Sequence, residues 1–146
     1  MNTVLKQLQI KLKQKNIKPT YIRLKVLNYF KNGQQHPDAE QIFRALKKEV
    51  PTVSMTSIYN TLDLFQKKGL IIPLFITGSE VRFDLKVAPH QHFFCERCGK
   101  IIDLHVDYEY FRKGNINGHR ITGIQGYFIG ICKNCREKIN KKRRKR

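Results

Sequence analysis

Apolar side chains recur every three or four positions in four segments before residue 69, which predicts four amphipathic helices. The first spans residues 4–15, the second begins after Thr20, the third opens at Pro37-Asp38, and the fourth begins after Ser54. Thr, Asp and Ser suit a helix start because their side chains accept hydrogen bonds from its free N–H groups. We assign to the buried faces Val4, Leu5, Leu8, Leu12, Ile22, Val26, Leu27, Phe30, Ala39, Ile42, Phe43, Leu46, Ile58, Leu62 and Phe65.

A β-hairpin is predicted after Gly69, where Leu70–Phe75 and Glu80–Asp84 flank the turn residues Thr77-Gly78-Ser79. Helices followed by a basic helix and a hairpin describe a winged helix-turn-helix domain, in which the fourth helix is the recognition helix. Short polar side chains near its start can reach base edges and phosphates. We predict that Ser57, Tyr59 and Asn60 contact bases or backbone, and that Arg23 and Lys67 contact phosphates.

The pattern changes after residue 85, where shorter apolar runs predict a small α/β lobe. Strands are expected at 93–95, 100–106, 118–123 and 126–132, with a short helix at 107–114. The expected fold class is therefore α+β, with a winged-helix domain at 1–84 and a small second domain at 85–137, to which the family resemblance given below assigns dimerisation. A basic, disordered tail is expected at 138–146.

Charge is the most unusual feature of the composition, with 29 Lys and Arg against 11 Asp and Glu and a net charge of +18. Such an excess implies a polyanionic partner, most simply nucleic acid. The segment 138–146 supplies seven of the positive charges, yet the remainder of the chain is still strongly basic. This segment is either a solvated end or a phosphate-binding arm.

Two Cys-x-x-Cys pairs, Cys95/Cys98 and Cys132/Cys135, contain every cysteine of the chain. Four thiolates in two close pairs predict a closed, tetrahedral structural zinc site that staples distant segments together. A disulfide framework or a thioredoxin-like redox pair is the alternative. The N-terminal residues contain no signal-peptide core and no segment is long and apolar enough to span a bilayer, so we expect a cytoplasmic protein, whose cysteines favour metal.

A second group of candidate ligands consists of imidazoles and carboxylates. His90 and His92 lie two residues apart, so on a strand both rings point to the same face. Asp84 ends the predicted hairpin, Asp103 follows the first cysteine pair, and His36 lies in the other lobe. Such donors suit Fe(II), Mn(II), Zn(II) or Ni(II). A metal ion joining His36 to ligands in the second lobe would fix the angle between the lobes.

Four motifs occur in this order: HPDAEQIF at 36–43, SIYNTL at 57–62, VRFD at 81–84 and HQHFFCERCGK at 90–100. Together with the second cysteine pair they make the chain resemble the ferric-uptake-regulator (Fur) superfamily from about residue 15 to residue 137. Within that superfamily it is most similar to the peroxide-responsive repressors.

The resemblance implies a regulatory iron or manganese ion held by three His and two Asp, which match His36, Asp84, His90, His92 and Asp103. It also implies a homodimer that binds an inverted-repeat operator in double-stranded DNA when metal is bound. The resemblance further implies that peroxide reacts with the bound iron and that the resulting oxidant modifies His36 or His90, so that the DNA is released. No small-molecule substrate other than peroxide as a signal, and no membrane partner, is expected.

Two other functions stay open on the sequence. An iron, zinc or manganese uptake regulator would load metal reversibly without peroxide chemistry. A zinc-ribbon RNA- or ribosome-binding protein would explain the charge, but the chain lacks exposed aromatic clusters for stacking bases. An enzyme is not expected, because the thiolate site is closed and no His-x-Glu stands beside a cysteine pair.

Overall fold

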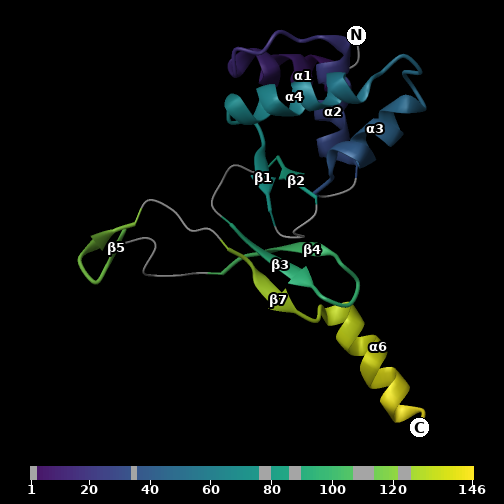
Figure 1. Cartoon of the computed structure of the whole chain (residues 1–146), viewed down its shortest axis with the longest axis vertical. Helices are drawn as coiled ribbons and strands as arrows, with labels where there is room; N and C mark the ends of the chain where they lie inside the picture. The colour runs from purple at the N-terminus through teal and green to yellow at the C-terminus, as the bar shows by residue number, and fades with distance from the viewer. Residues whose placement is uncertain (1–2, 34–35, 76–79, 86–89, 107–113, 122–125) are drawn as a thin grey trace. The chain divides into compact units, whose positions relative to one another are not determined.

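The computed structural model describes residues 3–33, 36–75, 80–85, 90–106, 114–121 and 126–146. The chain divides into two compact units, Met1–Ala88 and Pro89–Arg146 (Figure 1). The sequence pattern predicts this division a few residues earlier, after residue 84. None of the described helices is both long enough and apolar enough to cross a lipid bilayer.

The N-terminal unit contains the four expected helices, α1 (Thr3–Gln14), α2 (Tyr21–Asn32), α3 (Ala39–Lys47) and α4 (Met55–Lys67). The three expected cap residues each accept a backbone N–H. Thr20 caps α2, Asp38 caps α3 and Ser54 caps α4. Asp38 also forms a full capping box, in which the side chain of Gln41 accepts the backbone N–H of Asp38 at 2.9 Å.

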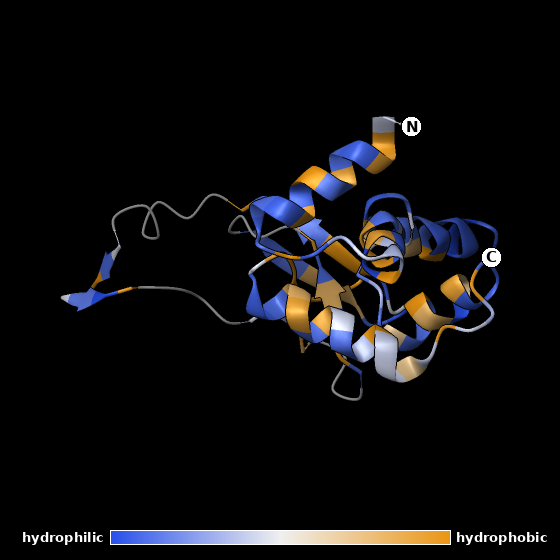
Figure 2. Ribbon diagram, turned by 90° about the horizontal axis from the view of Figure 1, so that it is seen from above, coloured by the Kyte–Doolittle hydropathy of each residue, from blue (hydrophilic) through white to orange (hydrophobic). Residues whose placement is uncertain are grey.

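Apolar side chains from α1 to α4 form one buried cluster. Figure 2 shows hydrophilic and hydrophobic colours alternating along α1, the helix at the N-terminus, as expected for an amphipathic helix. Most predicted core positions lie in this cluster, although Val4 and Leu5 of α1 are exposed. The largest fully buried side chains of the helices are Phe65, Leu12, Leu27, Ile42, Ile58 and Leu62.

The wing hairpin pairs β1 (Ile72–Leu74) with β2 (Arg82–Asp84) in antiparallel register. The first strand is shorter than predicted because Leu70 and Ile71 are buried in the helical core instead of pairing. Gly69 makes this turn possible with φ +65°, a conformation that L side chains rarely adopt. The predicted turn residues at 77–79 lie outside the described residues.

The C-terminal unit contains a three-stranded sheet of β3 (Gln91–Cys95), β4 (Ile101–Leu104) and β7 (Phe128–Gly130). Their order is β4-β3-β7, with β3 antiparallel to β4 and parallel to β7. A small hairpin joins β5 (Asn115–Ile116) to β6 (His119–Arg120). The strand predicted at 118–123 includes β6, and no strand was predicted at β5. The predicted helix at 107–114 falls mostly on residues 107–113, which are outside the described ones.

The structure differs from the expected disordered tail at 138–146. Helix α6 runs over Lys133–Arg144, starting at the second cysteine pair (Figure 1). Lys, Arg and Glu are good helix formers, and Cys132 and Cys135 anchor the first turn by burial. No apolar period marks this segment, because Ile139 is the only aliphatic residue of the helix.

Candidate metal centres and DNA-binding face

The four cysteines converge at one end of the three-stranded sheet. Cys95 ends β3 and Cys98 lies in the turn before β4, where Gly99 adopts φ +70° and donates its N–H to the carbonyl of Cys95 at 2.9 Å. Cys132 is the N-cap of α6 and Cys135 lies in its first turn. The parallel pairing of β3 with β7 therefore brings the two pairs together despite their separation in sequence.

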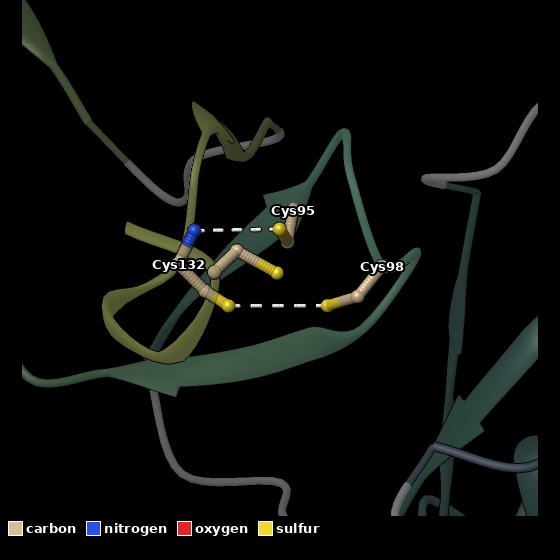
Figure 3. A group of neighbouring side chains, drawn as sticks. Cys95, Cys98 and Cys132 are labelled. Atoms are coloured by element: carbon tan, nitrogen blue, oxygen red, sulfur yellow. Dashed lines mark hydrogen bonds between the residues drawn. The ribbon is translucent and has the colours of Figure 1, made fainter. Parts of the chain in front are cut away.

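The spacing of the sulfur atoms fits a tetrahedral zinc ion. The four Sγ atoms lie within 4.8 Å of one another, and Cys98 Sγ is 3.9 Å from Cys132 Sγ (Figure 3). A tetrahedron of Zn–S bonds of about 2.3 Å has edges of about 3.8 Å. A disulfide would need about 2.05 Å, and all four cysteines are free. The geometry therefore favours the predicted zinc site over a disulfide framework.

The thiols do not all ionise easily without a cation. The backbone N–H of Cys132 donates to Cys95 Sγ at 3.3 Å and, with further N–H groups of the turn, lowers the pKa of Cys95 to about 6. The neighbouring Cys132 thiol and burial raise the pKa of Cys135 to about 12. A divalent cation that stabilises all four thiolates resolves this conflict, which is the role of structural zinc.

The first group of imidazole and carboxylate ligands lies in the N-terminal unit. His36 precedes α3, and Asp84 ends β2; the Nε2 atom of His36 is 3.6 Å from Oδ2 of Asp84, with both side chains nearly buried. The wing and the start of α3 hold these two residues together. Phe83 donates its N–H to the carbonyl of Pro37 at 3.0 Å, and Asp38 forms an isolated antiparallel bridge with Arg82.

The second group lies in the C-terminal unit. The Nε2 atoms of His90 and His92 are 3.5 and 3.6 Å from the same Oδ1 atom of Asp103. Their rings meet edge-on with centroids 4.5 Å apart, so both imidazoles point to one face as the spacing predicted. The strand register explains why the Asp103 carboxylate lies beside these imidazoles, because His92 on β3 pairs with Asp103 on β4.

Each group fits a divalent first-row metal ion such as iron(II) or manganese(II). Both combine imidazole nitrogen with carboxylate oxygen, the donors these ions prefer, and both are largely buried. Ligand atoms of an octahedral ion bound at about 2.1 Å lie about 3 Å apart, close to the separations within each group. We call these groups the His36–Asp84 half-site and the His90–His92–Asp103 half-site.

The residues predicted to contact DNA lie in the N-terminal unit and differ in how exposed their side chains are. Tyr59, Asn60 and Lys67 are exposed on α4, where Lys67 also pairs with Asp63 at 2.8 Å. Ser57 is half-buried at the start of α4, and Arg23 is half-buried while donating to the carbonyl of Lys18 at 3.0 Å. The three exposed side chains can reach a duplex from the helix surface, whereas Arg23 would have to leave its local partner.

Two features were missed by sequence reasoning. Arg82 donates from Nη1 to the carbonyl of His36 at 3.1 Å, and His36 itself has φ +53°. The second cysteine pair opens a helix, for which the Lys, Arg and Glu residues after Cys132 were the available signal. No local pattern in the sequence reports the left-handed backbone of a histidine.

The chain matches the ferric uptake regulator family over residues 14–121. It is 32% identical over 132 residues to the peroxide operon regulator of Bacillus subtilis (strain 168), covering 88% of this chain and 91% of that protein. It is also similar to the Helicobacter pylori ferric uptake regulator structure, with a TM-score of 0.71 and 23% identity over 92% of each chain. That likeness supports the fold alone.

A third similarity is to the structure of the peroxide regulator PerR of Streptococcus pyogenes, with a TM-score of 0.51 and 27% identity, covering 90% of this chain and 92% of that one. The chain therefore belongs to the ferric uptake regulator family of metal-responsive regulators, and its relatives include proteins named as peroxide-responsive repressors. The family is one of regulators, in agreement with the prediction that the chain is not an enzyme.

Proposed function

We propose that this protein is a metal-dependent transcriptional repressor of the cytoplasm that binds operator DNA as a homodimer and senses peroxide. The observation that carries the proposal is the pair of buried imidazole–carboxylate half-sites, one in each unit, in a chain 32% identical to a peroxide operon regulator. Neither half-site alone offers enough protein ligands for tight binding of a six-coordinate ion, so each needs further donors.

Both half-sites hold the same metal ion in this proposal. His36 and Asp84 supply two ligands, and His90, His92 and Asp103 supply three, which gives the mixed nitrogen and oxygen set that iron(II) and manganese(II) accept. One ion held by both units restricts the angle between them. The two repeats of an inverted-repeat operator are separated by about one turn of the DNA helix. The angle between the units therefore decides whether the two recognition helices of a dimer fit the DNA.

The metal ion can switch DNA binding only if the protein binds the ion more tightly in one conformation than in another. An ion that binds the DNA-competent arrangement more tightly than other arrangements shifts the population toward it. Loss of one imidazole reduces that difference. The repressor therefore binds its operator when the five-ligand site is filled and releases it when a ligand is damaged.

Dimerisation is supported by the apolar surface of the C-terminal unit. Strand β7 is at the edge of the described sheet, and its residues Phe128 and Ile129 are 40% and 56% exposed. These two side chains point to opposite faces of the strand, so both faces of β7 present apolar surface. Exposed apolar edge strands favour pairing with another chain. A second copy of this unit is the partner that a dimeric repressor supplies.

DNA recognition is assigned to α4 and the wing. Tyr59 and Asn60 are exposed near the start of α4, which is where the recognition helix of a helix-turn-helix domain meets base edges. We assign Lys67, near the other end of α4, to a phosphate contact. An inverted-repeat operator follows from the two-fold symmetry of the dimer.

Peroxide sensing needs a metal that gives up electrons. A bound iron(II) would supply the electrons that cleave the O–O bond of peroxide, leaving an oxidant able to add one oxygen atom to an adjacent imidazole. His36 and His90 are the rings that we expect to be modified. An oxidised imidazole is a poorer ligand, so the metal site opens and the operator is released.

Peptide mass spectrometry tests this chemistry. Zinc-loaded protein is charged with Fe(II) or Mn(II), given a brief peroxide pulse and digested. We expect one added oxygen on the peptide of His36 or His90 with iron and none with manganese. If iron is bound and neither peptide changes, the protein is instead a reversible iron, zinc or manganese uptake regulator. If Ala substitution of His36 leaves oxidation of His90 unchanged, the shared site is wrong.

A further inference from the structure

Helix α6 and the two residues after it form the most basic surface of the described chain. The segment 133–146 contains nine Lys or Arg side chains against one acid, Glu137. All ten of these side chains are exposed. The family match ends at residue 121, so this segment lies beyond it.

The charges surround the helix instead of lining one face. Lys141, Lys142, Arg143 and Arg144 are consecutive, and consecutive helical residues point about 100° apart. The remaining positions offer little apolar surface, because Cys132 and Cys135 are buried at the zinc site and Ile139 is half-buried. Figure 2 shows the ribbon that leads to the C-terminus in hydrophilic colours.

This distribution identifies the class of partner. A membrane-surface helix needs a broad apolar face opposite its basic face, and a protein-docking helix needs apolar anchors. Helix α6 offers neither. Phosphate groups spaced regularly along a nucleic acid backbone require only dense positive charge, and release of their counterions supplies the binding free energy.

We propose that the segment 133–146, which we call the α6 arm, binds the phosphate backbone of duplex DNA independently of base sequence. The proposal rests on the DNA-binding function given above and adds a second DNA-binding element outside the winged helix. Zinc matters to this element, because the ion fixes the first turn of α6 to the sheet through Cys132 and Cys135.

The salt dependence of binding measures the number of phosphates that the protein neutralises. The slope of log K against log salt concentration changes by about 0.9 for each phosphate. The test variant is the triple substitution Lys142→Gln, Arg143→Gln and Arg144→Gln in the full chain. The control removes three exposed charges of the same unit that lie outside the arm, Arg97→Gln, Lys100→Gln and Arg120→Gln.

Both variants are titrated against a labelled duplex of random sequence between about 50 and 200 mM salt, after zinc content and helicity are verified. We expect the arm variant to neutralise two to three fewer phosphates, which makes the slope shallower by about 2 units. The affinity at the lowest salt concentration should fall at least tenfold. The control is expected to change the slope by less than about 0.9, the value for one phosphate. Equal effects in both variants would overturn the proposal, as would an unchanged slope in the arm variant.

A parallel titration with duplex RNA decides between partners. Tighter binding of RNA than of DNA by the parent protein, with that preference abolished in the arm variant, would overturn the assignment to DNA. Failure of the repressor function gives a different result. In that case manganese adds no sequence-selective binding even in the parent protein, whereas failure of the α6 proposal alone leaves selective binding intact with an unchanged salt slope.

A separate observation concerns Arg82, and we infer that it is a positioning residue for the His36–Asp84 half-site. His36 adopts φ +53°, which costs a non-glycine residue conformational energy. The Nη1 atom of Arg82 donates to the carbonyl of His36 at 3.1 Å. Arg82 and Asp84 both belong to β2. The side chain of Arg82 therefore links the backbone of His36 to the strand that carries Asp84.

Manganese affinity tests this role, which rests on the proposed metal site. Loss of groups that orient metal ligands typically costs 10- to 100-fold in affinity. Arg82→Gln is expected to weaken Mn(II) binding by about tenfold or more, with partial rescue by Arg82→Lys. Ser54→Ala is the control, since it weakens a helix cap of the same unit without touching the half-site.

Unchanged Mn(II) affinity in Arg82→Gln, with stability reduced as in the control, would overturn the inference. If the parent protein binds no Mn(II), the proposed metal site fails first.

Discussion

The two units of this protein are stabilised by different means. The N-terminal unit buries a continuous apolar cluster drawn from α1 to α4, from Leu70 and Ile71, and from Phe83. In the described part of the C-terminal unit, the buried cluster consists of Cys95, Cys132 and Cys135 packed against Phe93. One unit is therefore held by hydrophobic burial and the other by its metal-binding thiols.

The difference has a physical origin in size and composition. A short unit cannot bury enough apolar surface to offset its conformational entropy, and metals commonly supply what is missing. In the C-terminal unit Phe128, Ile129 and Ile131 remain exposed instead of joining a core. A substitution that destabilises one unit should therefore leave the other unit folded.

Removal of zinc should have the largest effect. Cys95→Ser is expected to unfold the C-terminal unit, because structural zinc contributes on the order of 10 kcal/mol to folding in small zinc domains. The N-terminal unit should stay folded, since all four cysteines belong to the other unit. Limited proteolysis with fragment mass analysis measures this. The control is Lys133→Ser, an exposed position between Cys132 and Cys135. Protection of residues 90–146 in a zinc-free variant would contradict the comparison.

A cavity in the helical core should give the converse result. Phe65→Ala is expected to lower the free energy of unfolding of the N-terminal unit by about 3–5 kcal/mol. Phe65 is fully buried in α4, so its loss leaves a large void. Zinc content should stay at one ion per chain. Tyr59→Ala on the same helix is the matched control, because Tyr59 is 56% exposed and should change stability by about 0.5 kcal/mol or less. Denaturant titration measures both variants.

A charge on β7 should break the dimer without unfolding either unit. Ile129→Glu places a carboxylate in the surface that we assign to the second copy, and a buried, unpaired charge is strongly unfavourable. Sedimentation velocity is expected to show monomers at concentrations where the parent protein is dimeric. The control is Ile10→Glu on α1, another exposed isoleucine. Dissociation by both variants, or by neither, would place the interface elsewhere.

The smallest expected effect is at a helix cap. Ser54 Oγ accepts the N–H of Ser57 at 3.1 Å at the start of α4. Ser54→Ala should cost the N-terminal unit about 1 kcal/mol, and Ser54→Asp should restore most of it. Thermal unfolding of the zinc-loaded protein measures the change. A destabilisation as large as that of Phe65→Ala would show that the cap does more than satisfy one N–H group.

The same contrast explains what could be predicted from the sequence. In the N-terminal unit, burial imposes the helical period, and the caps Thr20, Asp38 and Ser54 mark the starts of three helices. All four helices could be predicted for this reason. In the C-terminal unit, short strands and sulfur ligands replace a repeating apolar pattern. Helix α6 was missed because its residues are helix formers without an apolar face.

The candidate metal ligands were predictable in part. The Cys-x-x-Cys pairs and the His-x-His spacing are local signals, and the structure brings each set together. The pairing of His36 with Asp84 depends on how the wing packs against the start of α3, which is a long-range interaction. The role of Arg82 depends on the left-handed backbone at His36, which no local pattern encodes.

In the function that we propose, one metal ion joins the two half-sites. Mn(II) titration of zinc-loaded protein, followed by the electron paramagnetic resonance signal of free Mn(II), tests it most directly. We predict one tight Mn(II) per chain, abolished equally in His36→Ala and His92→Ala and retained in the control His119→Ala, whose side chain is exposed. Retention of full affinity in His36→Ala, with weakened binding only in His92→Ala, would show that the half-sites do not share an ion.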